Sequence, residues 1–120
     1  MMAKGVCAGL LCLLMLPAGP AWPGEEQGSE ILDTCRSEPL ALAGDPVGSV
    51  RYGLCLGYLK GIADMRDGDG FCLPGMGSAR LTQALKHAYL EYAERHPETL
   101  SSAARNSVLP AFREAFPCRH

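Results

Sequence analysis

Four of the six cysteines of this sequence are the side chains whose chemistry is easiest to specify; the other two, Cys7 and Cys12, lie in the amino-terminal segment that we expect to be removed. Cys35, Cys55, Cys72 and Cys118 all follow an apolar amino-terminal segment, and no two of them have the Cys-x-x-Cys spacing typical of zinc sites or haem attachment. An even number of thiols in a small exported chain indicates a disulfide framework. We therefore expect two disulfide bonds, with no metal and no cofactor.

Four cysteines can pair in three ways, and their spacing alone does not choose among them. We favour Cys35 with Cys72, which would join a short opening helix to a loop, and Cys55 with Cys118, which would join the tail to the middle of a long helix. Each bond would close several dozen residues, which corresponds to roughly 3 to 4 kcal/mol of loop entropy.

The remaining polar residues do not form a catalytic pattern. His87 stands four residues before Glu91, a spacing more typical of a surface contact on a helix than of a catalytic pair. Asp64, Asp67 and Asp69 lack the alternation and the final Glu of a calcium-binding loop and are better read as an acidic turn. We predict no catalytic residue and no enzyme activity.

The amino-terminal residues predict export. Lys4 precedes an apolar stretch over residues 6–16, which Pro17 ends, and Ala21 suits a signal peptidase. About a dozen apolar residues are too few for the ~20 that a membrane-spanning helix needs. We expect residues 1–21 to be a cleaved signal peptide and the mature chain to be periplasmic.

The mature chain is expected to contain a flexible arm over residues 22–28 and one domain over residues 29–118. Removing Lys4 with the leader leaves ten basic and thirteen acidic residues, a formal net charge of −3. The basic residues are scattered singly, which argues against a nucleic-acid partner.

Capping residues and apolar spacing predict an all-α bundle of about four helices. Ser29 is expected to cap a short first helix, and Asp45 with Pro46 to start a second one after a connection over residues 39–44. Ser78 is expected to cap the third helix, which should end before Pro97.

A fourth helix should run from Pro97 to Phe116, with a kink or break at Pro110. Its predicted core positions are Leu100, Ala104, Val108, Phe112 and Phe116.

Apolar residues at spacings of three and four predict which helix faces are buried. The second helix is expected to bury Val50, Leu54, Tyr58, Ile62 and Met65. The third is expected to bury Leu81, Leu85, Ala88, Tyr89 and Tyr92 and to expose Arg80, Gln83, Lys86 and Glu94. A row of glycines, Gly53, Gly57 and Gly61, indicates close backbone approach; we favour a neighbouring helix of the same chain over a dimer or partner contact.

Several motifs in one order resemble the Rap/Tai family of immunity proteins. They are Cys35, Cys55-Leu-Gly-Tyr-Leu-Lys-Gly-Ile-Ala-Asp64, Phe71-Cys-Leu-Pro74, His96-Pro97-Glu98 and Ala115-Phe-Pro-Cys118. The resemblance implies a periplasmic, disulfide-bonded helical protein, often a homodimer, that protects bacteria from type VI secretion effectors by blocking a peptidoglycan amidase. Pro110 and the short tail depart from the family pattern.

The resemblance implies a mechanism of occlusion, in which a tethered loop fills the effector's substrate groove. We expect the loop over residues 67–76 to do this, through Asp67, Asp69, Phe71 and Met76. Phe71 and Leu73 could equally fill the domain's own core. The main alternative function is a periplasmic acid-stress chaperone of similar build.

Overall fold

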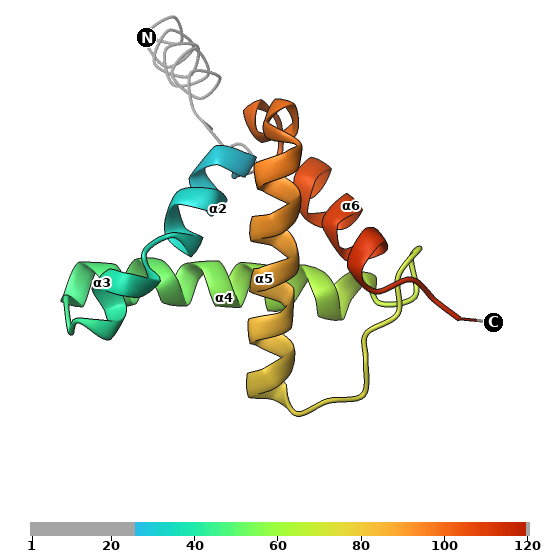
Figure 1. The fold of residues 1–120 in the computed structure, drawn as a ribbon, viewed down its shortest axis with the longest axis horizontal. Helices are drawn as coiled ribbons and strands as arrows, with labels where there is room; N and C mark the ends of the chain where they lie inside the picture. The colour runs from blue at the N-terminus through green and yellow to red at the C-terminus, as the bar shows by residue number, and fades with distance from the viewer. Residues whose placement is uncertain (1–25, 120) are drawn as a thin grey trace, which may run out of the picture.

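The computed structural model describes residues 26–119, which contain six helical segments and no β-strand (Figure 1). The segments are α2 (Gly28–Cys35), α3 (Glu38–Leu42), α4 (Pro46–Arg66), α5 (Ser78–Arg95), the 3₁₀ helix η1 (Pro97–Ser101) and α6 (Arg105–Ala115). The predicted all-α fold is therefore confirmed. The predicted signal peptide lies outside the described residues.

Two long helices organise the molecule. Figure 1 shows α5 lying across α4, with α2 and α6 on either side of α5. The core lies between these four helices and is completed by Phe71 from the loop after α4. Its largest fully buried side chains are Tyr89, Phe71, Phe112, Leu59, Leu85 and Val108.

The start of α4 follows the predicted capping. The Asp45 carboxylate accepts a hydrogen bond from the Gly48 amide at 2.7 Å, and Pro46 is the first helical residue. An acceptor at the cap satisfies an amide that has no partner within the helix.

Residues 26–28, which close the predicted arm, bond to the rest of the domain, and Ser29 is not the cap. Gln27 occupies the cap position, and α2 begins at Gly28, which is buried. The Gly28 amide donates to the Ser102 carbonyl at 3.0 Å, and the Ala104 amide donates to the Glu26 carbonyl at 2.7 Å. The end of the predicted arm is therefore fixed against the chain between η1 and α6.

The same contacts explain why the fourth predicted helix is broken. The interruption lies at residues 102–104, where the backbone bonds to residues 26–28 instead of continuing a helix. Pro110 lies inside α6 without ending it, so the break predicted at Pro110 is wrong in position. Proline removes one donor from the helix there, and the packing of α6 outweighs this loss.

The predicted connection over residues 39–44 contains the short helix α3. Gly44 then turns the chain into α4 with φ of +83°. The two helices approach so closely that a Cβ on Gly48 would lie 2.5 Å from the Leu40 Cβ. This position needs glycine because the backbone of α3 occupies the space.

The disulfide pairing that we favoured is wrong. The structure contains Cys35–Cys55 and Cys72–Cys118, each with 4.9 Å between the Cα atoms. α2 packs directly on α4, which brings Cys35 to Cys55, and the tail returns to the loop, where the Cys72 amide donates to the Phe116 carbonyl at 2.9 Å.

The apolar stripe of α4 was assigned to the wrong face. Its buried residues are Gly48, Cys55, Leu59 and Ala63. Val50, Leu54 and Met65 are 65%, 59% and 84% exposed, whereas Tyr58 and Ile62 pack at the edge of the core. The spacing does mark an apolar face, but residues 26–119 do not cover it.

On α5, the predicted apolar face is confirmed and one predicted surface residue is buried. Leu81, Leu85, Ala88 and Tyr89 are buried, and so is Lys86. The Lys86 ammonium pairs with Glu38 of α3 and lies 5.5 Å from the centre of the Tyr52 ring of α4. Burial lowers the pKa of Lys86, but the hydrogen bonds that its ammonium donates to Glu38 and Tyr52 outweigh this effect and raise the pKa above its ordinary value. The lysine thus joins three helices.

Candidate functional site: a tethered loop and an uncovered helix face

The loop between α4 and α5 spans residues 67–77 and is held at several points. Gly68 and Gly70 have φ of +92° and +84°, which side-chain-bearing residues rarely adopt. The Gly68 amide donates to the Phe71 carbonyl at 2.8 Å, closing a tight turn. The Cys72–Cys118 disulfide then fixes the centre of the loop to the tail.

Both acidic residues of the loop help to build it. The Asp67 carboxylate accepts a hydrogen bond from the Leu73 amide at 2.9 Å. Asp69 accepts from the Arg66 guanidinium at 2.9 Å, and its backbone carbonyl accepts from Arg113 of α6 at 3.3 Å. The hydrogen bond from Arg66, together with the positive charge of that residue, holds the pKa of Asp69 below its ordinary value.

Phe71 is a core residue in this structure. It is fully buried and packs edge to face on Phe112, with 5.5 Å between ring centres. The alternative that Phe71 fills the domain's own core is therefore correct for this residue. Its side chain is not available to a partner in this conformation. Met76, by contrast, is 37% exposed.

A hollow of about 370 Å³ lies where the loop meets the tail. It is lined by Cys72, Pro74, Ala115, Phe116, Pro117 and Arg119. Arg119 places a cation beside apolar loop atoms, so this face is not purely acidic. The sequence did not lead us to expect the tail beside the loop, because the favoured pairing of Cys118 with Cys55 placed the tail against the middle of α4.

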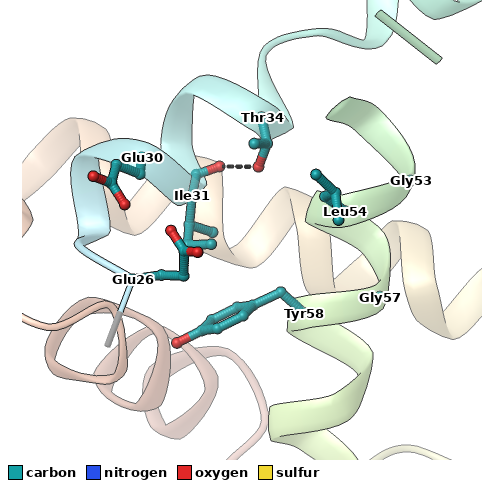
Figure 2. Close-up of a pocket in the computed structure, with 8 residues that line it drawn as sticks. All are labelled: Glu26, Glu30, Ile31, Thr34, Gly53, Leu54, Gly57 and Tyr58. Atoms are coloured by element: carbon teal, nitrogen blue, oxygen red, sulfur yellow. Dashed lines mark hydrogen bonds between the residues drawn. The ribbon is translucent and has the colours of Figure 1, made fainter. Parts of the chain in front are cut away.

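A second hollow, of about 340 Å³, lies between α2 and α4 (Figure 2). Its lining is largely apolar: Ile31 and Thr34 come from α2, and Gly53, Leu54, Gly57 and Tyr58 come from α4. Glu26 and Glu30 also line it. A hydrogen bond shared with Glu30, together with the negative charge of Glu30, raises the pKa of Glu26 above its ordinary value.

The glycine row of α4 borders this hollow and faces open space. A Cβ added at Gly53, Gly57 or Gly61 would meet no atom of residues 26–119 within 4 Å. Crowding by a neighbouring helix of the same chain, which we favoured from the sequence, is therefore wrong. Each glycine costs a helix about 1 kcal/mol relative to alanine, and no contact among the described residues offsets that cost.

The titratable residues elsewhere do not form a reactive cluster. His87 and Glu91 contact each other at 3.0 Å, and both are mostly exposed, as expected for a surface pair. Within residues 26–119, no group of three or more His, Cys, Asp or Glu side chains could hold a metal ion. No helix in this part of the chain is long and apolar enough to cross a membrane.

The family model of Rap1a immunity proteins matches residues 27–118, nearly all of the described chain. The chain belongs to the Rap1a immunity protein family. No curated protein sequence and no solved structure matches it. The match covers both disulfides, the tethered loop and the outward face of α4, so each of these features lies within the Rap1a region.

Proposed function

We propose that this Rap1a family protein is a periplasmic immunity protein that binds a type VI secretion effector, expected to be a peptidoglycan amidase, and blocks its substrate groove. The observation that carries the proposal is the family match over residues 27–118. Immunity of this kind requires a stable protein surface and no chemistry.

The loop over residues 67–77 has the properties that occlusion needs. A disulfide, the Asp67 hydrogen bond and the Arg66–Asp69 ion pair all restrain it. A restrained loop loses little conformational freedom on binding, so more of the contact energy contributes to affinity. Two long helices support both ends of the loop.

The surface offered to the effector centres on Met76 and the hollow beside Arg119. Met76 supplies an adaptable apolar contact, Arg119 lines the hollow, and the exposed Asp67 and Asp69 add negative charge to the loop. Phe71 contributes from within, because its burial against Phe112 fixes the base of the loop.

Export through a cleaved signal peptide over residues 1–21 and assembly into a homodimer belong to the same proposal. A peptidoglycan amidase acts in the periplasm, so its inhibitor must reach that compartment. Disulfide bonds also persist best in an oxidising compartment.

The test measures binding of the mature chain, residues 22–120, to amidase effectors purified from the same bacterium, by calorimetry. Met76→Asp places a charge at the proposed apolar contact and should weaken binding by about tenfold or more, without lowering the melting temperature. Leu42→Asp is the matched control, since Leu42 is 79% exposed on α3, far from the loop.

Equal affinity of Met76→Asp and the parent chain would reject the loop as the binding surface. Failure of the parent chain to bind any amidase would reject the amidase assignment. Suppression of client aggregation at low pH without effector binding would instead favour the acid-stress chaperone.

A further inference from the structure

The hollow between α2 and α4 is an open site with apolar walls. Ile31, which is 4% exposed, lines it from α2, and Leu54 and Tyr58 line it from α4 (Figure 2). Gly53 and Gly57 also line it, and a Cβ built on either glycine would meet no atom of residues 26–119 within 4 Å. Its volume of about 340 Å³ is at the lower end of the range for ligand pockets, which suits one large aromatic side chain.

Two carboxylates of the same hollow have no cation beside them in the described part of the chain. Glu26 and Glu30 line the hollow, and a hydrogen bond between them, together with the charge of Glu30, raises the pKa of Glu26. None of the ion pairs within residues 26–119 includes either side chain. A positive group placed next to both carboxylates would be stabilised. The hollow is therefore complementary to a cation that carries an apolar group.

The chain enters the domain beside this hollow. The Ala104 amide donates to the Glu26 carbonyl at 2.7 Å, so the backbone is held in place from residue 26 onward. Residues 22–25, Trp-Pro-Gly-Glu, directly precede Glu26. Four residues span at most about 13 Å at ~3.3 Å each, which keeps the start of this segment within reach of the hollow.

Removal of the predicted signal peptide would give Trp22 both of the groups that the hollow suits. Cleavage leaves an α-amino group on the first residue of the mature chain, and this group is mostly charged at neutral pH. The indole of the same residue is a large apolar ring. A cation and an aromatic side chain therefore arrive together, four residues before the first carboxylate.

We propose that Trp22, as the first residue of the mature chain, occupies the hollow between α2 and α4. Its indole packs against Ile31 and Leu54, and its ammonium pairs with the two carboxylates. The inference rests on the proposed export, because the backbone nitrogen of Trp22 carries no charge before cleavage. Signal-peptide removal would then add a contact to the fold and cover part of the apolar face of α4.

Tryptophan fluorescence of the mature chain, residues 22–120, tests the proposal without effector. Trp22 is the only tryptophan of the sequence, so its emission is measured without interference from a second indole. We expect emission at a shorter wavelength, and weaker quenching by acrylamide, than in the free peptide Trp-Pro-Gly-Glu. Equal emission and equal quenching of the chain and the peptide would overturn the inference.

Gly57→Leu reduces the space in the hollow and should shift Trp22 about tenfold toward the undocked form, so that its emission approaches that of the peptide. The variant should keep its fold, which circular dichroism checks, since no atom of residues 26–119 lies within 4 Å of the added Cβ. Gly61→Leu is the matched control, because it adds the same side chain to α4 one turn beyond the residues that line the hollow. Emission that is indifferent to Gly57→Leu would overturn the assignment of the hollow.

The contact of the ammonium is tested separately. Glu30→Gln removes one carboxylate, and a chain that begins at Gly19 moves the ammonium three residues away from Trp22. Each change should move the emission toward that of the peptide, whereas Glu94→Gln, on an exposed position of α5, should not. Unchanged emission in both altered chains would overturn the pairing of the ammonium with the carboxylates.

Other occupants of the hollow give different results. A shift of the Trp22 emission that appears only as the chain concentration rises would overturn the inference and assign the hollow to a second copy. A shift that appears only when effector is added would overturn it and assign the hollow to the effector. Docked Trp22 in a chain that binds no effector would reject the proposed function and support this inference, because the fluorescence is measured on the chain alone.

Discussion

Single residues set how closely the helices of this protein can approach. Gly48 allows the backbone of α3 to contact α4, and Gly28 allows α2 to approach Leu100 and Ser107. The outward glycines of α4, Gly53, Gly57 and Gly61, have no such contact in the part of the chain that the structure describes. Glycine therefore allows close packing at two positions and leaves an open helix face at the others. Only the atoms that surround each glycine distinguish the two cases.

Gly48→Ala should destabilise the fold by about 1 to 3 kcal/mol, because the new methyl group would overlap Leu40. Urea unfolding followed by circular dichroism measures the change. Ser49→Ala, one residue further along and exposed, is the control and should change the free energy of unfolding by less than about 0.5 kcal/mol. Equal effects would contradict the close packing of α3.

Tyr89→Phe should cost about 1 to 3 kcal/mol, although the ring remains. The buried Tyr89 hydroxyl donates to the Gly28 carbonyl at 2.9 Å and lies 3.3 Å from the Ser107 hydroxyl, so its removal deletes a buried hydrogen bond between α5 and α2. Tyr92→Phe, on the same helix, is the control. Thermal unfolding that is equally affected in both variants would refute the role of this hydroxyl.

At the scale of elements, the sequence predicts the long helices well and their partners poorly. Local signals determine α4 and α5: Asp45 and Pro46 start one, and Pro97 follows the end of the other. The disulfide pairing and the buried face of α4 depend on which helices meet. Those contacts join residues distant along the chain, and helical periodicity carries no information on them.

The loop was predicted in position and only partly in role. Clustered Asp and Gly residues indicate a turn, and Cys72 indicates a tether. The burial of Phe71 and the contact of Asp69 with Arg113 arise from α6, whose approach the sequence does not show. Arg66 and Arg113 were therefore missed as residues that hold the loop.

The two disulfides should differ in their reactivity. Cys35 and Cys55 are almost fully buried, whereas Cys72 is exposed. Limited reduction followed by alkylation and mass spectrometry should label Cys72 and Cys118 first, because thiolate attack requires access to sulfur. Labelling of Cys35 and Cys55 first would contradict the burial of that pair.

The Arg66–Asp69 ion pair makes the loop sensitive to acid. Since the folded-state pKa of Asp69 is lowered, the stabilisation is fully present above the ordinary Asp pKa and is lost as pH falls through the lowered value. Hydrogen exchange of the loop amides should therefore differ between Asp69→Asn and the parent chain at pH 6. The difference should vanish once Asp69 is protonated, and a difference independent of pH would contradict the ion pair.

At the scale of the whole molecule, the two candidate surfaces lie apart. Figure 1 shows the loop beyond one end of α4 and α2 toward the other end, and the hollow beside α2 is lined by residues 53–58 in the middle of α4. One chain could therefore contact an effector through the loop while Trp22 occupies the hollow.

This separation predicts that effector binding and the docking of Trp22 are independent. Met76→Asp should leave the fluorescence of Trp22 unchanged, and Gly57→Leu should leave the effector affinity unchanged. Fluorescence and titration calorimetry of each variant measure both quantities. If Met76→Asp changed the fluorescence of Trp22, or if Gly57→Leu changed the effector affinity, the two surfaces would overlap or be coupled.

The order of the disulfides along the chain also bears on how the protein matures. Among the four cysteines of residues 26–119, the first bonds to the second and the third to the fourth, so the two covalent rings follow one another without interlacing. An oxidant that acts on thiols as they emerge from the export channel would join Cys35 to Cys55 before Cys72 arrives. The native bonds can then form in a single pass, and cells that lack a disulfide isomerase should still accumulate correctly oxidised protein.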